Sequence, residues 1–167
     1  MSQATEILNN AMATTMPDLT SEWDKEKLRN WMANAKRLGR NDVYQAAFRQ
    51  LCRVEGRNIE DPLEAEFATV MRALEEALTE ESGRTKRLSR TRQKLNRVGV
   101  RQTLADLALK PQPSLGFMKL LEFNMADMSA EALILKYRNE FDEEVMAAAE
   151  RRLAEYDVPI PNARALR

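Results

Sequence analysis

Residues 61–83, "DPLEAEFATVMRALEEALTEESG", decide the fold. Asp61 is suited to cap a helix, Pro62 fits the first helical position, and Glu64 lies where a capping box places its acid. Apolar residues then recur at the helical period until Gly83, a usual helix-ending residue, and these are Leu63, Phe67, Val70, Met71, Leu74 and Leu78. The stretch predicts one amphipathic helix over residues 61–82.

The same spacing extends in both directions from this helix. Each of the five glycines falls where a helix would end, and the apolar residues between them follow the helical period without sustained alternation. We therefore expect an all-α fold, a compact bundle of about seven or eight short to medium helices with no sheet.

Upstream, the pattern predicts a helical hairpin around "LGRND", residues 38–42. The first helix should open at Thr20 or Ser21 and run to about Leu38, and the second should start at Asn41 as its cap. The expected inward residues are Leu28, Trp31, Ala35 and Leu38 in the first helix and Val43, Ala47, Phe48, Leu51 and Val54 in the second.

Downstream, the pattern predicts four more short helices, one after Gly99 and three capped by Ser114, Ser129 and Asp142. Their expected inward residues are Leu104, Leu107, Leu109, Phe117, Leu120, Leu121, Val145, Ala149 and Leu153. We expect an N-terminal arm over 1–19, a single helical domain over 20–157 and an extended tail over 158–167, which holds two prolines. The domain could divide into lobes 20–83 and 84–157.

Composition argues against several classes of chemistry. The chain of 167 residues has no histidine and one cysteine, Cys52. It therefore lacks the commonest general base and the preferred zinc ligand, and it cannot assemble a thiolate metal cluster. It also has no glycine-rich phosphate loop of the Walker or dinucleotide type. We expect a non-catalytic protein without a metal site or small-molecule cofactor.

The single cysteine and the distribution of apolar residues indicate the cellular compartment in which we expect the protein. Cys52 cannot form an internal disulfide, which favours a reducing environment. The N-terminal stretch has no basic region followed by a continuous apolar run, and the chain has no uninterrupted apolar segment of membrane-spanning length. We expect a cytoplasmic protein that does not bind membranes.

The strongest candidate for a binding site is "RTKRLSRTRQKLNRVGVR", residues 84–101, with eight Lys or Arg and no acid. On one continuous helix, five cations would share a stripe about 80° wide. These are Arg87, Arg90, Lys94, Arg97 and Arg101, with Arg92 at the margin. Cations neutralise phosphates, and amides such as those of Gln93 and Asn96 can contact bases.

The turn after this stretch resembles the cadence of a helix-turn-helix. In "KLNRVGVRQTLADLAL", residues 94–109, Gly99 would sit in the turn between two short helices. The cations precede the turn, so they belong to the first helix and not to the one that would enter a groove.

Two interpretations of the basic stretch stay open. One is a nucleic-acid contact surface, for DNA in preference to RNA, formed by Lys86, Arg87, Arg90, Gln93, Lys94, Arg97 and Arg101. The other is a solvated face, or one paired with the acidic helix over 61–82, in a protein-binding adaptor or homo-dimer. Such an adaptor would use its charge dipole or its Met-rich C-terminal half, and a net charge of zero is compatible with it.

Overall fold

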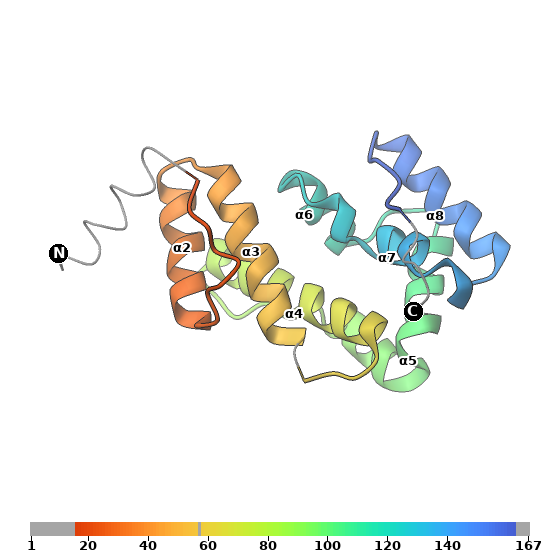
Figure 1. Cartoon of the computed structure of the whole chain (residues 1–167). Coiled ribbons are helices and arrows are strands. Elements are labelled where there is room, and N and C mark those ends of the chain that lie inside the picture. The colour runs from red at the N-terminus through yellow and green to blue at the C-terminus, as the bar shows by residue number, and fades with distance from the viewer. Residues whose placement is uncertain (1–15, 57, 163–167) are drawn as a thin grey trace, which may run out of the picture. The chain divides into compact units, whose positions relative to one another are not determined.

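The computed structural model describes residues 16–56 and 58–162. The fold is all-α: seven α-helices and two short 3₁₀ helices form the described part of the chain, which contains no strand (Figure 1). The helices are α2 (Lys25–Arg37), α3 (Asn41–Gly56), α4 (Pro62–Ser82), α5 (Ser89–Leu109), α6 (Leu115–Glu122), α7 (Ala130–Lys136) and α8 (Glu143–Glu155), with η1 (Ala126–Met128) and η2 (Arg138–Glu140). The predicted fold class is confirmed.

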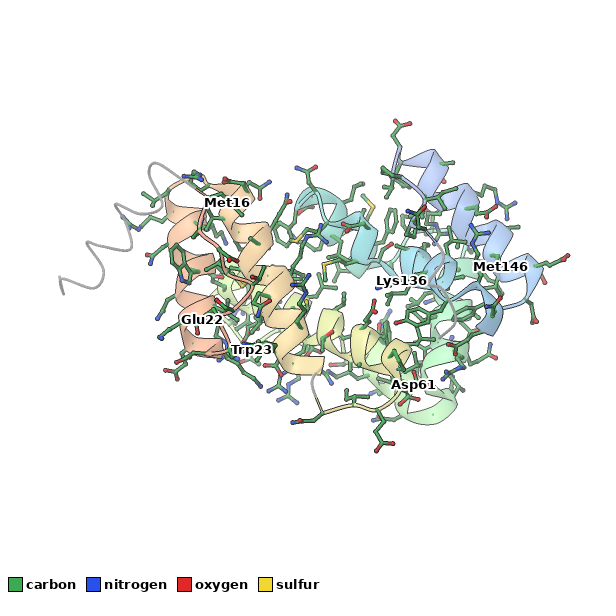
Figure 2. The ribbon with its side chains drawn as sticks, viewed as in Figure 1. Met16, Glu22, Trp23, Asp61, Lys136 and Met146 are labelled. Carbon is green, nitrogen blue, oxygen red and sulfur yellow. The ribbon has the colours of Figure 1, made fainter. Side chains whose placement is uncertain are left out.

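The chain divides into two compact units, Met1–Arg57 and Asn58–Arg167. The division therefore lies well before the predicted lobe boundary between residues 83 and 84. The reason is that α4 packs against α5, α6 and α7, so it belongs with the helices that follow it. An ion pair joins α7 to α4, because Lys136 Nζ lies 2.7 Å from Glu66 Oε2. Figure 2 labels Lys136 and Asp61 in this unit.

The first unit contains the helical hairpin of α2 and α3. Helix α2 begins at Lys25 and not at Thr20 or Ser21, because the Asp24 carboxylate accepts hydrogen bonds from the backbone N–H groups of Glu26 and Lys27. Its buried residues are Leu28, Met32 and Ala35. The expected Trp31 is only half-buried and Leu38 is 40% exposed, so the inward stripe is rotated from the predicted one.

Helix α3 explains why the chain before α2 is not helical. Its Gln50 side chain is buried and donates to two backbone carbonyl oxygens, that of Thr20 at 3.0 Å and that of Glu22 at 2.8 Å. These bonds hold residues 20–22 against α3 in a non-helical path. Four of the five residues expected to face inward from α3 are fully buried, namely Val43, Ala47, Phe48 and Leu51, and Val54 is half-buried.

The second unit is organised around α4, whose predicted ends are confirmed. Asp61 is the N-cap and accepts from the Glu64 N–H at 3.0 Å, Pro62 takes the first turn, and Gly83 ends the helix in the left-handed region at φ 64°. Five of the six predicted inward residues are buried, and Leu78 is half-buried. Three of them, Leu63, Phe67 and Met71, share a core cluster with residues of α5, α6, α7 and α8.

The residues predicted to cap α6, α7 and α8 occupy the cap positions of these helices. Two details differ from the prediction, one at the cap of α8 and one in the burial of α5. Ser114 and Ser129 accept from the backbone N–H groups of Phe117 and Ala132, as expected. Asp142 occupies the cap position of α8 without a side-chain hydrogen bond, and Leu109, expected to face inward, is 44% exposed. Of the tail predicted over 158–167, residues 158–162 are non-helical and 163–167 lie outside the described residues, as do residues 1–15 of the arm predicted over 1–19.

A buried ion pair that the sequence did not reveal joins α7 to α8. Arg152 Nη1 lies 3.0 Å from Glu131 Oε1 and donates to the Leu107 carbonyl at 3.2 Å, while Nη2 donates to the Lys110 carbonyl. Arg152 therefore also satisfies backbone carbonyls at the end of α5. Burial raises the pKa of Glu131, because removal from water penalises the charged carboxylate.

Candidate nucleic-acid interface

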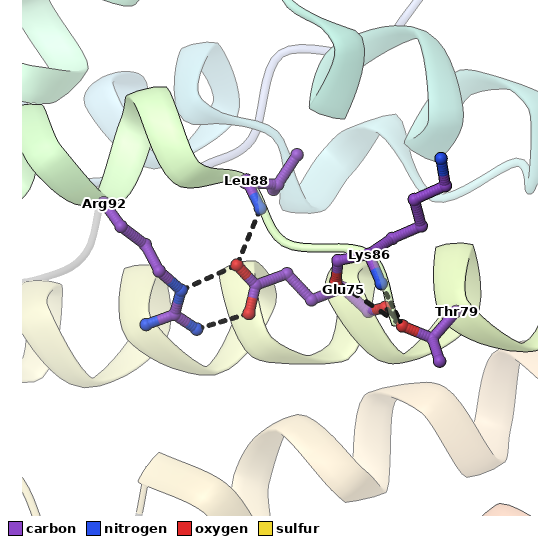
Figure 3. Close-up of polar contacts among 5 residues, drawn as sticks. All are labelled: Glu75, Thr79, Lys86, Leu88 and Arg92. Carbon is purple, nitrogen blue, oxygen red and sulfur yellow. Dashed lines mark hydrogen bonds and ion pairs between the residues drawn. The ribbon is translucent and has the colours of Figure 1, made fainter. Parts of the chain in front are cut away.

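The basic stretch, residues 84–101, is non-helical at its start and helical from Ser89 onward. Residues 85–88 are not helical, and α5 begins only at Ser89, so Lys86 and Arg87 precede the helix (Figure 3). Two hydrogen bonds to α4 hold this segment, from the Lys86 N–H to Thr79 Oγ1 and from the Leu88 N–H to Glu75 Oε1, both 2.8 Å. The predicted helical phase of Arg87 is therefore wrong.

Arg92 is bound to the acidic helix. Its Nε and Nη2 atoms lie 2.6 and 2.5 Å from the two carboxylate oxygens of Glu75, a bidentate pair (Figure 3). Burial raises the pKa of Glu75, but hydrogen bonds from Arg92 and Leu88 and the nearby positive charge outweigh it, so the pKa is lowered. Glu75 thus fastens both the extended segment and the first turns of α5 to α4.

Lys94 pairs with an acid on the same helix, across a kink. Gly99 has non-helical angles, φ 80° and ψ 175°, and Lys94 Nζ forms an ion pair with Asp106 Oδ2 beyond it. In a straight helix these residues would be separated by about 18 Å of rise. The kink therefore allows the ion pair, and hydrogen bonds from Lys94 and Gln102 lower the pKa of Asp106.

The kink at Gly99 differs from the helix-turn-helix that the sequence resembles. Gly99 is the one residue inside α5 with non-helical angles, whereas that motif requires a turn of about three to four residues. The Thr103 hydroxyl donates to the Gly99 carbonyl at 2.7 Å, which begins the second half of the helix. The stretch is a kinked helix, not a groove-reading pair.

Arg101 lies beyond the kink and is surrounded by acids. Its Nη2 lies 2.8 Å from Asp61 Oδ2 and contacts Glu140 Oε2, and its Nη1 is 3.9 Å from Glu64 Oε1. The hydrogen bond from Arg101 is the main reason that the pKa of Asp61 is lowered. Arg101, predicted as part of the binding stripe, is neutralised within its own unit.

Five cations of the stretch keep their charged groups exposed, and we call them the basic face: Arg84, Lys86, Arg87, Arg90 and Arg97. In the described part of the chain, their side chains form no hydrogen bond or ion pair with an acid. Arg90, the predicted Gln93 and Arg97 lie at helical spacing within about 60° of one another. Glu75 of α4 thus pairs with Arg92, and Asp61 and Glu140 pair with Arg101, whereas the residues of the basic face stay exposed.

The described residues offer few other candidates for a site. Nowhere among residues 16–56 and 58–162 do three or more side chains of metal-ligating type converge. Over the same residues, every helix is too short or too polar to cross a membrane. No family model, curated protein or solved structure matches the chain.

Proposed function

We propose that this protein is a non-catalytic nucleic-acid-binding protein that contacts DNA, in preference to RNA, through the basic face. The observation that supports the proposal is the contrast within one stretch: Arg92, Lys94 and Arg101 form ion pairs with acids, whereas the five cations of the basic face form none in the described residues. The charges of Arg87 and Arg97 act on Glu75 and Asp106 only over a longer distance. Unneutralised cations on one surface are the electrostatic footprint of phosphate binding.

Local charge, not net charge, would drive the association. The whole chain carries as many acids as bases. Each cation that meets a phosphate releases condensed counterions, so binding should weaken steeply as salt rises. At physiological salt, charges more than about 8 Å apart are largely screened, so the acids of α4 weaken the attraction less than the net charge suggests.

The start of α5 adds to this surface. Leu88 at its N-cap position provides no side-chain hydrogen bond, so the first backbone N–H groups of the helix lack the usual side-chain cap. Helix N-termini attract phosphate through these groups. Arg87 precedes this helix end in the chain and Arg90 is the second residue of the helix, while the Glu75 carboxylate accepts from the Leu88 N–H.

Neutralising the basic face tests the proposal. The variant R87Q/R90Q/R97Q should bind a fluorescent DNA duplex of about 20 base pairs at least about tenfold more weakly than the parent protein at ~50 mM salt. The matched control is K36Q/R53Q/R151Q, which removes the same charge from exposed positions elsewhere. Equal binding by the two variants, or no binding by the parent protein to any nucleic acid, would contradict the proposal.

A second candidate function is a protein-binding adaptor or homo-oligomer. The observation that favours it lies on α6, where Leu115 is 60% exposed and Met118 is 36% exposed on the same side of the helix. Exposed large apolar side chains that lie together are typical of protein interfaces. Sizing the protein at low and high salt tests this function, and a monomer under both conditions would exclude the homo-oligomer.

A further inference from the structure

The basic face contains no aromatic side chain to stack on a base. Residues 84–101 include no Phe, Tyr or Trp. Proteins that bind single-stranded DNA or RNA combine a positive groove with aromatic rings on which the bases stack. The chemistry of this surface therefore suits the regular phosphates of a duplex better than the exposed bases of a single strand.

The first half of α5 is held too closely against its own unit to enter a groove. Glu75 binds Arg92 on one side of it, and Leu88 and Leu95 pack against the core of the second unit. A helix with its side chains fills the roughly 12 Å major groove, so it must stand clear of the protein to reach base edges. The long arginine side chains of the basic face can still reach phosphates at the groove edge.

The length of the basic face favours DNA over an RNA duplex. Residues 84–88 are largely extended and 89–97 are helical, so Arg84 and Arg97 are at most about 30 Å apart along the chain. Readers of double-stranded RNA contact two successive minor grooves over about 16 base pairs. Five cations within about 30 Å along the chain do not provide two such separated contacts.

We infer that the ligand of the basic face is the phosphate backbone of double-stranded DNA, bound without reading the base sequence. This inference rests on the proposed function and narrows it to one class of nucleic acid. Of the eight cations in residues 84–101, Arg92, Lys94 and Arg101 are already paired with acids. Only the five cations of the basic face are then available for contacts with phosphates. At most five phosphates are then neutralised by the basic face.

A limit of five phosphate contacts also limits how steeply the affinity for DNA depends on salt concentration. The logarithm of the affinity for duplex DNA should fall with the logarithm of salt concentration at a slope no steeper than about −4.5, since each contact contributes about −0.9. Two duplexes of unrelated sequence should bind equally within about threefold, because phosphate contacts carry no sequence information. Single-stranded DNA of the same length and double-stranded RNA should bind more weakly.

The outcomes separate this inference from the proposed function. Tighter binding to single-stranded DNA or to double-stranded RNA, or strong preference for one duplex sequence, would overturn the inference and leave nucleic-acid binding intact. Failure to bind any of the four probes would overturn both.

A gain-of-contact variant provides a sharper test with the full chain. D106N removes the charge that holds Lys94, so one more cation becomes available and the slope for duplex DNA should steepen by about 0.9. The control D142N makes the same change at an exposed aspartate that forms no side-chain cap bond. Equal slopes for D106N and D142N would overturn the inference that these charges meet phosphates.

Discussion

Arg152 and Arg151 are neighbours in the sequence with opposite surroundings. Arg152 is buried, paired with Glu131 and bonded to two carbonyl groups at the end of α5, whereas Arg151 is exposed. Removing one partner of a buried ion pair leaves an uncompensated charge away from water, which costs much more than losing a surface charge.

The variant R152L should therefore lower the free energy of unfolding by about 3–5 kcal/mol. The control R151L should change it by no more than about 0.5 kcal/mol, as is usual for exposed positions. Urea denaturation followed by circular dichroism measures both values. If R152L were no less stable than R151L, the buried pair would not support the fold.

Glu75 provides a pH-dependent contribution to stability. Its pKa is lowered in the folded protein, so its stabilising effect is fully present above its ordinary pKa of 4.5 and is lost as the pH falls through the folded value. Arg92 is 41% exposed, and solvent screening reduces the strength of the pair.

The variant E75Q should lower the free energy of unfolding by about 1–2 kcal/mol at neutral pH. The difference from the parent protein should begin to shrink below about pH 4.5, where the unfolded chain takes up a proton, and should be lost as the pH falls through the lowered pKa of Glu75 in the folded protein. E80Q, at an exposed position of the same helix, should show little difference at any pH. A pH-independent deficit of E75Q would show that the charge of Glu75 is not what stabilises this contact.

At the scale of elements, Gly99 determines the path of α5. Its φ of 80° and ψ of 175° fall in a region that only glycine enters readily, and a Cβ atom there would meet nothing within 4 Å. A substitution would therefore act through backbone strain and not through a clash.

The variant G99A should lower the free energy of unfolding by about 1–3 kcal/mol, and G99N should be no better tolerated. At Gly83, which is in the left-handed region with φ 64°, asparagine should be accepted with a smaller loss. Thermal unfolding of the three variants measures the order. Equal tolerance of asparagine at both glycines would contradict the observed angles at Gly99.

Elements whose ends depend on local signals could be predicted from the sequence. The ends of α4 were correct because Asp61, Pro62 and Gly83 act within one turn of the helix end. The predicted start of α2 was wrong, because Gln50 binds the carbonyl oxygens of Thr20 and Glu22 from about thirty positions away in the sequence. Trp31 and Met32 each fit a helical stripe with Leu28, so only packing could decide between them.

The candidate site, like the helix ends, could be predicted from the sequence only where local signals decide it. The sequence located the cations of residues 84–101, but their partners are brought to them by the fold: Glu140 reaches Arg101 from another element, and Asp106 reaches Lys94 across the kink. One signal in the sequence does indicate a partner for Glu75. This residue falls four positions after Met71, on the apolar face of α4, and an acid at such a position is buried only when it has a partner.

At the scale of the whole molecule, the two units differ in how much core they contain. The second unit has a core cluster drawn from five helices, whereas residues 16–56, the described part of the first unit, contain one pair of helices, α2 and α3. Chains shorter than about 60 residues bury a smaller fraction of their surface and are marginally stable alone.

The fragment 58–167 should therefore fold by itself, with a sigmoidal urea transition, and should retain the affinity of the full chain for duplex DNA. The fragment 1–57 should show no cooperative transition under the same conditions. Circular dichroism and the anisotropy measurement with the DNA duplex check both statements. A fragment 58–167 without cooperative unfolding would show that the second unit depends on the first.

The kink at Gly99 also separates two levels of local stability within α5. All five buried residues of the helix lie in its second half, Val100–Leu109, whereas the first half carries Arg90, Gln93 and Arg97 and buries no residue fully. Segments with few buried contacts open at a lower free energy than the core around them. The first half of α5 should therefore exchange its amide hydrogens faster than Val100–Leu109, although Glu75 holds its first turns to α4.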